Sequence, residues 1–228
     1  MDSSSAASRK LTREPSETGT DARILESAIT LFAERGFSEV TVREIAEHAG
    51  ANPAAISYYF GAKEQLIKQA IRSVIAPLIE QRLAALTALL SRGGPIDFVD
   101  VVRAMVEPTV RACMNGSGSE RHYARVLVLS FALRQPFVDE VMAEQTDEVA
   151  VRFVEALAQA LPGSDRATMF WRFDFMIGAL LHILLDSSRG HRLRRVSGGL
   201  TETSDPHAIT EQLVSFLAAG LKAPAPSL

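Results

Sequence analysis

Apolar residues recur at intervals of three and four positions along most of the chain, which predicts helices and gives no strand signal. The pattern therefore predicts an all-α fold. Pro77 is expected to bend the fourth predicted helix, and Pro108 to interrupt the fifth. The predicted helices cover residues 21–35, 42–49, 53–60, 63–90, 96–113, 120–133, 136–161, 164–188 and 206–221.

Residues 41–60 predict two short helices joined by a tight turn. Thr41 and Glu44 have the spacing of a capping box, in which each side chain satisfies a free backbone amide at a helix start. Gly50 is expected to end the first helix because glycine accepts the left-handed conformation of a C-terminal cap. Asn52 then caps a second helix with Pro53 at its first position.

The second helix of this pair has a face suited to reading DNA. Ile56 and Phe60 are expected to point inward, which leaves small or polar side chains on the outside. Small residues let a helix enter a major groove about 12 Å wide, where an alanine can touch a thymine methyl group. The candidate DNA contacts from this helix are Asn52, Ala54, Ala55, Ser57 and Tyr58.

The N-terminal part also resembles a known family. The matching stretches are TDARIL (20–25), LFAERGF (31–37), TVREIA (41–46), AGAN (49–52), YYF (58–60) and KE (63–64). In order and spacing they resemble the DNA-binding domain of the TetR family of repressor-like regulators. The resemblance implies an all-helical homodimer, with its third helix in the major groove, and a C-terminal domain that releases DNA when a small molecule binds.

Carried over by position, the resemblance implies that Thr41, Tyr59 and Lys63 hold phosphates, with Thr20 doing the same near the start of the first helix. The family often has a glycine or polar residue where Ala54 and Ala55 stand, so base recognition here is expected to depend more on shape and methyl contacts. The implied architecture has a tail (1–18), a three-helix helix-turn-helix DNA-binding domain (19–78), and a helical effector-binding and dimerisation domain (79–228).

The charge distribution argues against DNA binding when taken alone. The chain has a net charge of −3. Residues 21–72 hold six basic side chains against seven acidic ones, where a DNA-binding module is expected to be basic. A few well-placed donors are enough for phosphate contacts, and helix N-termini supply some of them. The residues Arg9, Lys10 and Arg13 could add contacts, although a solvated, disordered tail is the simpler interpretation of 1–18.

Composition places the chain in the cytoplasm. Its longest apolar run, 176–185, is too short to cross a bilayer, and the N-terminal segment lacks the apolar core of a secretory signal, so no membrane partner is expected. The lone Cys113 excludes an intrachain disulfide and is interpreted as an ordinary helix residue. The sequence shows no metal-ligand spacing, no cofactor motif and no catalytic combination of side chains, so we expect no metal, no cofactor and no enzymatic activity.

The predicted helix 164–188 is apolar nearly all round, which indicates burial on both sides. A second subunit is one explanation, and a purely internal core helix is the alternative. Together with the last helix it predicts an isologous four-helix interface. The candidate interface residues are Trp171, Phe175, Gly178, His182, Leu185, Leu213, Phe216, Leu217 and Gly220.

An apolar effector pocket is predicted from the class of helical domain and not from particular residues. The residues that could line it would equally make an ordinary core. Its candidate lining is Phe98, Met105, Phe131, Phe137, Met142 and Phe153. The basic run 189–195 is interpreted as a solvated loop that pairs with acidic neighbours. We expect a homodimeric repressor that leaves a pseudo-palindromic operator when an unidentified small molecule binds. The alternatives are an activator without a ligand, or a helical carrier whose N-terminal module no longer reads DNA.

Overall fold

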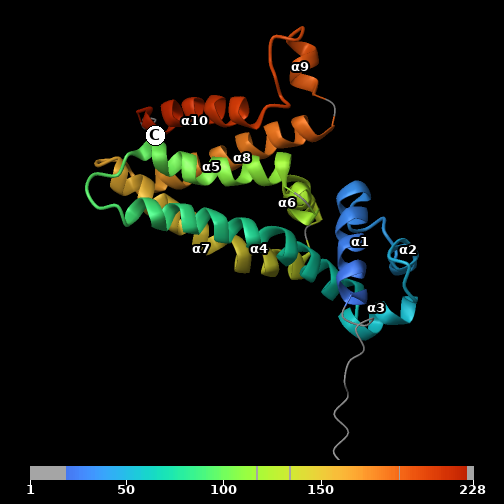
Figure 1. The fold of residues 1–228 in the computed structure, drawn as a ribbon. Helices are drawn as coiled ribbons and strands as arrows, with labels where there is room; N and C mark the ends of the chain where they lie inside the picture. Colours follow the sequence, from blue (N-terminus) through green and yellow to red (C-terminus); the bar gives the residue numbers. More distant parts are fainter. Residues whose placement is uncertain (1–18, 117, 134, 190, 225–228) are drawn as a thin grey trace, which may run out of the picture.

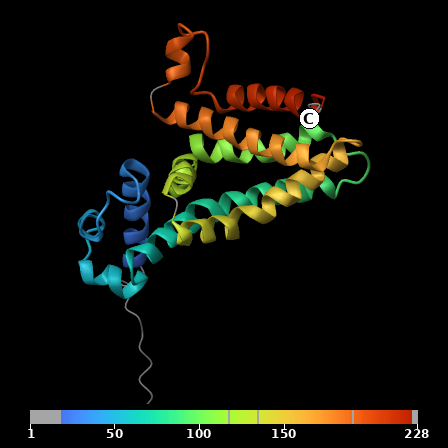
Figure 2. The same ribbon diagram turned by 180° about the vertical axis from the view of Figure 1, so that it is seen from behind.

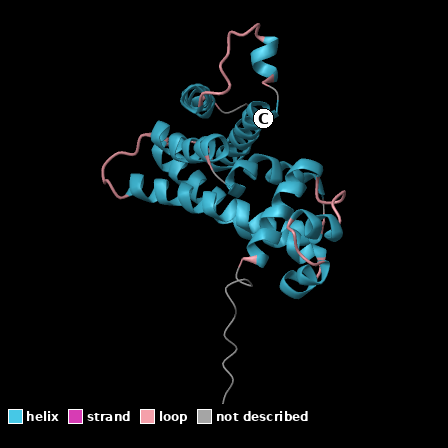
Figure 3. Cartoon of the chain, turned by 45° about the vertical axis from the view of Figure 1, so that its right-hand side comes forward, coloured by secondary structure: helices cyan, strands magenta, loops and turns pink. Residues whose placement is uncertain are grey.

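A computed structural model describes residues 19–116, 118–133, 135–189 and 191–224, so the predicted tail 1–18 lies outside the described residues. The all-α prediction is confirmed: within these ranges the chain forms helices and loops, and no strand (Figures 1 and 3). The helices are α1 (Thr20–Arg35), α2 (Val42–His48), α3 (Pro53–Phe60), α4 (Lys63–Leu90), α5 (Phe98–Asn115), η1 (Gly118–His122), α6 (Tyr123–Leu133), α7 (Pro136–Ala160), α8 (Arg166–Arg189), α9 (Arg192–Val196) and α10 (Pro206–Lys222).

The first three helices form a small module at one end of the molecule (Figure 1). Its core consists of apolar side chains that are completely buried, among them Ile24, Phe32, Ile45 and Ile56. The Phe32 and Phe37 rings lie 5.3 Å apart, so the residue that follows the Gly36 cap packs back on α1. Helix α1 contacts α2, α3 and α4, and it therefore braces the helix pair that follows it.

Helix α4 connects this module to the rest of the molecule. It starts beside α3, and it packs against α1, α5 and α7 along its length (Figures 1 and 2). Pro77 lies inside this helix. The prediction that Pro108 interrupts the next helix is wrong, because α5 continues through it. Pro108 is itself buried, as are its neighbours Thr109 and Val110, and this packing holds the helix together where one backbone bond is missing.

The larger part of the molecule is built in layers. Helices α4 and α7 lie side by side, α5 and α8 lie over them, and α10 packs on α5 and α8 (Figures 1 and 2). Several predicted boundaries shift, among them both ends of the helix predicted over 96–113, which covers Phe98–Asn115. The helix predicted over 120–133 begins as the 3-10 helix η1, and the helix predicted from 164 begins two residues later. There the Asp165 carboxylate accepts a 2.7 Å bond from the Thr168 amide.

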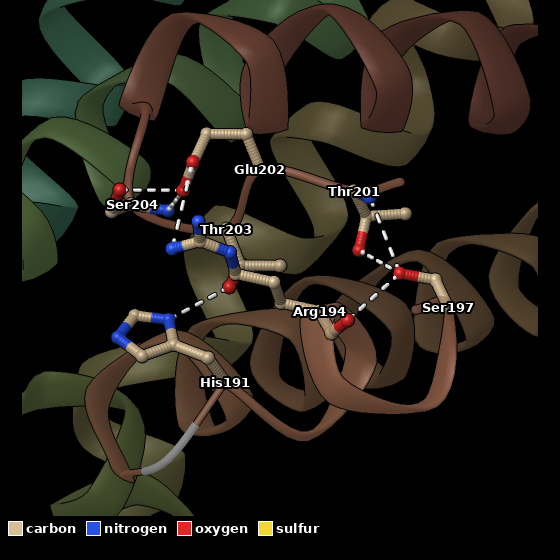
Figure 4. A network of polar contacts seen from close by, with 7 residues as sticks. All are labelled: His191, Arg194, Ser197, Thr201, Glu202, Thr203 and Ser204. Atoms are coloured by element: carbon tan, nitrogen blue, oxygen red, sulfur yellow. Dashed lines mark hydrogen bonds and ion pairs between the residues drawn. The ribbon is translucent and has the colours of Figure 1, made fainter. Parts of the chain in front are cut away.

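The basic run 189–195 is not a loop, because most of it lies in the short helix α9 (Figure 4). Its predicted pairing with acidic neighbours is confirmed by the Arg194 guanidinium, which lies 3.8 Å from the Glu202 carboxylate. The His191 Nδ1 atom lies 2.7 Å from the Thr203 hydroxyl, and the Thr203 side chain is buried. These contacts attach α9 to the segment that leads into α10.

Two helices, α4 and residues 166–187 of α8, are long and apolar enough to cross a membrane by length and composition alone, with a mean hydropathy of 1.4. The prediction from the longest apolar run did not consider these longer helical windows. On α4, Lys68 and Arg72 pair with the α7 carboxylates of Glu140 and Glu144. These ion pairs fit a helix packed inside a helical domain.

Candidate functional site

The start of α2 is held by the capping box that the sequence predicts. The Glu44 amide donates to the Thr41 hydroxyl at 3.2 Å, and the Thr41 amide donates to the Glu44 carboxylate at 2.8 Å. The Arg35 guanidinium pairs with the same carboxylate at 2.8 Å. The backbone and side-chain bonds from Thr41, followed by the one from Arg35, lower the pKa of Glu44 to about 2. This corner is therefore fixed by hydrogen bonds as well as by packing.

Helix α3 begins as predicted. The Asn52 side chain accepts a 2.9 Å hydrogen bond from the Ala54 amide, and Pro53 occupies the first helical position. Ile56 is completely buried and anchors the helix to the module. The Asn52 oxygen accepts this bond, and both N–H donors of its side-chain amide remain for a contact outside the protein.

The outer face of α3 is exposed and carries small or polar side chains. Ala54, Ser57 and Tyr58 are exposed, and Tyr58 keeps 78% of its side-chain surface. They follow one another at three- and four-residue spacing, so they share one side of the helix. Ala55, another of the predicted base contacts, is half-buried and packs against the core, so it is turned away from this face.

The predicted phosphate contacts surround α3. The Tyr59 ring meets the Tyr58 ring edge to face at 5.0 Å. Lys63, the first residue of α4, donates to the Ser38 carbonyl at 3.4 Å, and burial lowers the pKa of its ammonium group. Thr20 begins α1. The start of α1, helix α3 and the start of α4 lie at the same end of the molecule (Figures 1 and 2).

The Thr41 hydroxyl lies in the turn that leads into α2, where it also donates to the Glu44 carboxylate at 2.7 Å. A phosphate would therefore have to compete with Glu44 for this hydrogen. The backbone amides at the start of α2 remain a second source of donors at this position.

Two family models match the chain. The model described as bacterial regulatory proteins of the tetR family matches residues 24–70, which span α1 to the start of α4. The model described as the tetracyclin repressor-like C-terminal domain matches residues 103–220, more than half of the chain. The chain belongs to the TetR family. It is a transcriptional regulator of the helix-turn-helix class.

Sequence relatives in the TetR family match the N-terminal part. The chain is 38% identical over 65 residues to the regulator BetI of Rhizobium meliloti, covering 28% of this chain and 32% of that protein. It is 36% identical over 62 residues to the repressor KstR2 of Rhodococcus jostii, covering 27% and 30%. The alignments thus span about a third of the length of the curated relatives, and they concern the DNA-binding module.

Solved TetR-like structures match nearly the whole fold. A TetR-like regulator from Rhodococcus sp. RHA1 has a TM-score of 0.60 at 22% identity, covering 93% of this chain and all of that one. A regulator from Saccharomonospora viridis, solved in complex with choline, has a TM-score of 0.58 at 17% identity, covering 89% and 96%. At these identities the likeness shows the fold alone.

Helices α8 and α10 of this TetR-family chain expose large aromatic side chains. Trp171, Phe175 and Phe216 are 67%, 63% and 70% exposed, and the first two rings lie 6.0 Å apart. The predicted interface residues Gly178, His182 and Gly220 are also exposed. A Cβ atom added at either glycine would meet no atom within 4 Å.

Three predicted interface residues lie elsewhere. Leu213 and Leu217 are buried in the core of the chain, and Leu185 is half-buried and packs against that core. These leucines therefore fit the alternative interpretation, an internal stripe, whereas the aromatic residues do not. A helix that is apolar all round can pack one face in its own core and expose another to a partner, and the sequence pattern does not distinguish these two faces.

A cavity of about 370 Å³ lies between α4, α5, α6, α7 and α8. Of the predicted pocket residues, Met105 and Phe131 line it. Phe98 instead packs at the far end of α5, where the Lys222 ammonium lies 4.1 Å from its ring centre. The other three predicted residues, Phe137, Met142 and Phe153, pack in the core without lining this cavity.

Two cavity residues, Arg82 and Tyr123, are not among the sequence predictions. Both are buried, with 2% exposure each. A signal for Arg82 exists in the sequence, since it falls four residues after Leu78 and four before Leu86 on the apolar stripe of α4. A charged side chain on such a stripe indicates either a buried partner or a ligand.

The half-buried Cys113 lies near this region and fits its predicted role as an ordinary helix residue. Burial raises the pKa of its thiol to about 11, so little reactive thiolate forms at neutral pH. Among the residues that the structure describes, no group of three His, Cys, Asp or Glu side chains is placed to hold a metal ion.

Proposed function

We propose that the chain acts as a homodimeric repressor that binds a pseudo-palindromic operator and leaves it when a small molecule binds. The observation that carries this proposal is the exposed face of α3, where Ala54, Ser57 and Tyr58 stand on a helix fixed by its caps and by Ile56. A helix with small outer residues enters a major groove, because its backbone can approach the base edges.

The proposed contacts divide into two classes. Ala54, Ser57 and Tyr58 face bases, and the Asn52 amide group reaches the edge of the same groove. Thr20, Thr41, Tyr59 and Lys63 hold phosphates on either side. The module has no net positive charge, since residues 21–72 hold six basic side chains against seven acidic ones. We therefore expect affinity to fall with salt through the few phosphate contacts named above, with helix N-termini adding donors.

The proposed dimer forms through the exposed parts of α8 and α10. Three large exposed aromatic side chains are costly to leave in water, and covering them with the same helices of a second subunit would make an isologous interface. Gly178 and Gly220 let the two backbones come close. In such a dimer the two α3 helices must lie about 34–36 Å apart to enter successive major grooves.

The proposed domain boundary lies inside α4, near residue 78, and this has a mechanical consequence. The same helix belongs to the DNA-binding module at its start and lines the cavity with Ile79 and Arg82 further along. A ligand that favours one position of α4 would change the spacing of the two reading heads. We place this function in the cytoplasm, where operator DNA is found.

KstR2 is named as a repressor, and the structure from Saccharomonospora viridis contains choline. The first supports repression as the proposed mode, and the second supports a small-molecule site in this fold. An activator would bind DNA without release by a ligand. A carrier would bind a small molecule and no specific DNA, so the two alternatives separate by experiment.

Selection of bound fragments from a random DNA library tests this proposal. We expect an enriched inverted repeat whose half-sites are about one helical turn apart. The Tyr58→Ala variant, which removes an exposed side chain from α3, should enrich a different or shorter motif. Recovery of unenriched sequences by the native protein would contradict the proposal and favour the carrier.

A further inference from the structure

The buried guanidinium of Arg82 has an unusual set of partners. Its Nε and Nη2 atoms donate to the Thr109 hydroxyl at 2.9 and 2.6 Å, and its Nη1 atom donates to the Tyr123 hydroxyl at 2.9 Å. The Thr109 hydroxyl donates in turn to the Met105 carbonyl at 3.1 Å. All of these partners are neutral.

No carboxylate neutralises this charge among the described residues, since none of their ion pairs includes Arg82. The half-buried Glu120 interacts with Gln81 instead, at 3.4 Å. A buried charge is costly unless it is both paired and hydrogen-bonded. Arg82 satisfies only the second condition, because no ion pair of the described residues includes its guanidinium.

Arg82 and Tyr123 keep hydrogen-bond donors that no described residue accepts. A guanidinium has five N–H groups, of which three are used here. The Tyr123 hydroxyl accepts from Arg82, and its own hydrogen has no acceptor among the described residues. Both side chains line the cavity between α4 and α8. The buried end of the cavity thus offers N–H and O–H donors around a positive charge.

The rest of the cavity is suited to an apolar group. Ile79, Leu127, Phe173 and other apolar side chains form its walls, and exposed aromatic rings lie at its rim: Phe131 with 58% and Phe170 with 38% of their surface free. The volume of about 370 Å³ is at the small end of ligand pockets. This combination favours a small molecule with one polar head and an apolar body.

The charges at the opening determine the orientation. Asp147 and Asp174 also line the cavity, and both are exposed. They repel an anion at the entrance, whereas Arg82 attracts it at the buried end. We propose that this cavity receives a small organic anion with an apolar body, whose head accepts hydrogen bonds from Arg82 and Tyr123. Its role as the effector rests on the function proposed above.

Calorimetry with three probes of equal chain length tests the proposal: octanoate, octanol and octylammonium, each titrated into the full-length protein. We expect octanoate to bind at least about tenfold more tightly than octanol, since a hydrogen-bonded charge at a buried site contributes about that much. Octylammonium should bind more weakly than octanol. Equal binding of octanoate and octanol, or no binding of octanoate, would overturn the proposal.

Variants assign the preference to the named residues. Arg82→Met should abolish the preference for octanoate over octanol, and Tyr123→Phe should reduce it several-fold. Arg103→Met is the matched control, because Arg103 pairs with Glu211 outside this cavity and its loss should leave the preference unchanged. If Arg82→Met does not fold, Tyr123→Phe alone still tests whether these residues produce the preference for octanoate. A preference that survives in both folded variants would overturn the assignment.

DNA binding, measured on the same samples, separates this inference from the proposed function. Octanoate that binds through Arg82 without weakening DNA binding would support the anion site and contradict its role in release. A protein that binds octanoate in this way and no specific DNA at all would also support the site, and would contradict the repressor.

Discussion

The Arg125 guanidinium of α6 donates to the Glu34 carbonyl in the last turn of α1 at 2.5 Å, and so joins the cavity-lining helices to the DNA-binding module. The same helix turns Tyr123, Leu127 and Phe131 toward the cavity at four-residue spacing. A small displacement of α6 on ligand binding would therefore pull on the end of α1. This gives a second physical route, beside α4, from the cavity to the reading helix.

Replacing Arg125 with alanine should weaken this connection. The loss of one charged hydrogen bond to a helix-terminal carbonyl costs about 1 kcal/mol, which lowers the Tm by about 2–4 °C in a domain of this size. DNA binding without a ligand should persist, and the ligand concentration needed for release should rise. Thermal denaturation and DNA titrations with octanoate measure the two effects.

Arg121→Ala is the control for that variant, since Arg121 is exposed and its side chain bonds only to the neighbouring His122 among the described residues. Arg121→Ala should leave both the Tm and the octanoate concentration needed for release unchanged. Release that is equally sensitive to octanoate in Arg125→Ala and in the native protein would exclude this contact as a route.

The capping box gives the module a defined pH dependence. The pKa of Glu44 falls from 4.5 to about 2 on folding, so its ionised form stabilises the folded state fully above about pH 4.5. That contribution is lost as the pH falls from about 4.5 to about 2. Glu44→Gln should be less stable than the native protein at neutral pH, and the difference should shrink across this window. Urea denaturation at a series of pH values measures it, and a difference that does not change with pH would contradict this account.

Much of the DNA-binding module could be predicted from local sequence, because its boundaries are set by contacts between near neighbours. The bonds of Thr41 with Glu44 and of Asn52 with Ala54 span three and two residues, and both side chains are recognisable caps. The burial of Ile56 follows from helical periodicity. Ala55 is the exception, since whether a small side chain faces in or out depends on the rotation of the whole helix.

Lys63 should make a phosphate contact that is independent of sequence. Lys63→Gln is expected to weaken binding to all DNA fragments alike. It should reduce the slope of log affinity against log salt by about one for each bound subunit, which is about two for the dimer. Lys68→Gln is the matched control on the same helix, since Lys68 pairs with Glu140 of α7. Anisotropy titrations over a salt series compare the two variants. An unchanged slope in Lys63→Gln would remove this residue from the interface.

The exposed aromatic side chains of α8 and α10 should hold the dimer together. Trp171→Arg and Phe216→Asp change exposed side chains, so each should fold and yet sediment as a monomer at concentrations where the native protein is a dimer. Leu200→Asp is the control, because Leu200 is 91% exposed and lies outside these helices. Sedimentation velocity measures the oligomeric state of each protein. A monomeric native protein, or variants that remain dimeric, would contradict the proposed interface.

The larger part of the molecule was less predictable, because its features depend on contacts between distant segments. The continuous helix through Pro108 depends on burial by neighbouring helices, and α9 depends on contacts such as the pair between Arg194 and Glu202. The cavity needs five helices to converge. The sequence marks Arg82 as a charge on an apolar stripe, but only the fold shows that Tyr123 and Thr109 are its partners.

The central claim is that two copies of this chain read specific DNA through α3. Fluorescence anisotropy with DNA from immediately upstream of its own gene, across a salt series, tests it most directly. We expect saturable binding with two subunits per site that is much tighter than binding to random DNA. Replacing Tyr58 and Lys63 should abolish it. The claim would be contradicted if the protein binds both that DNA and an operator selected in vitro no more tightly than it binds random DNA.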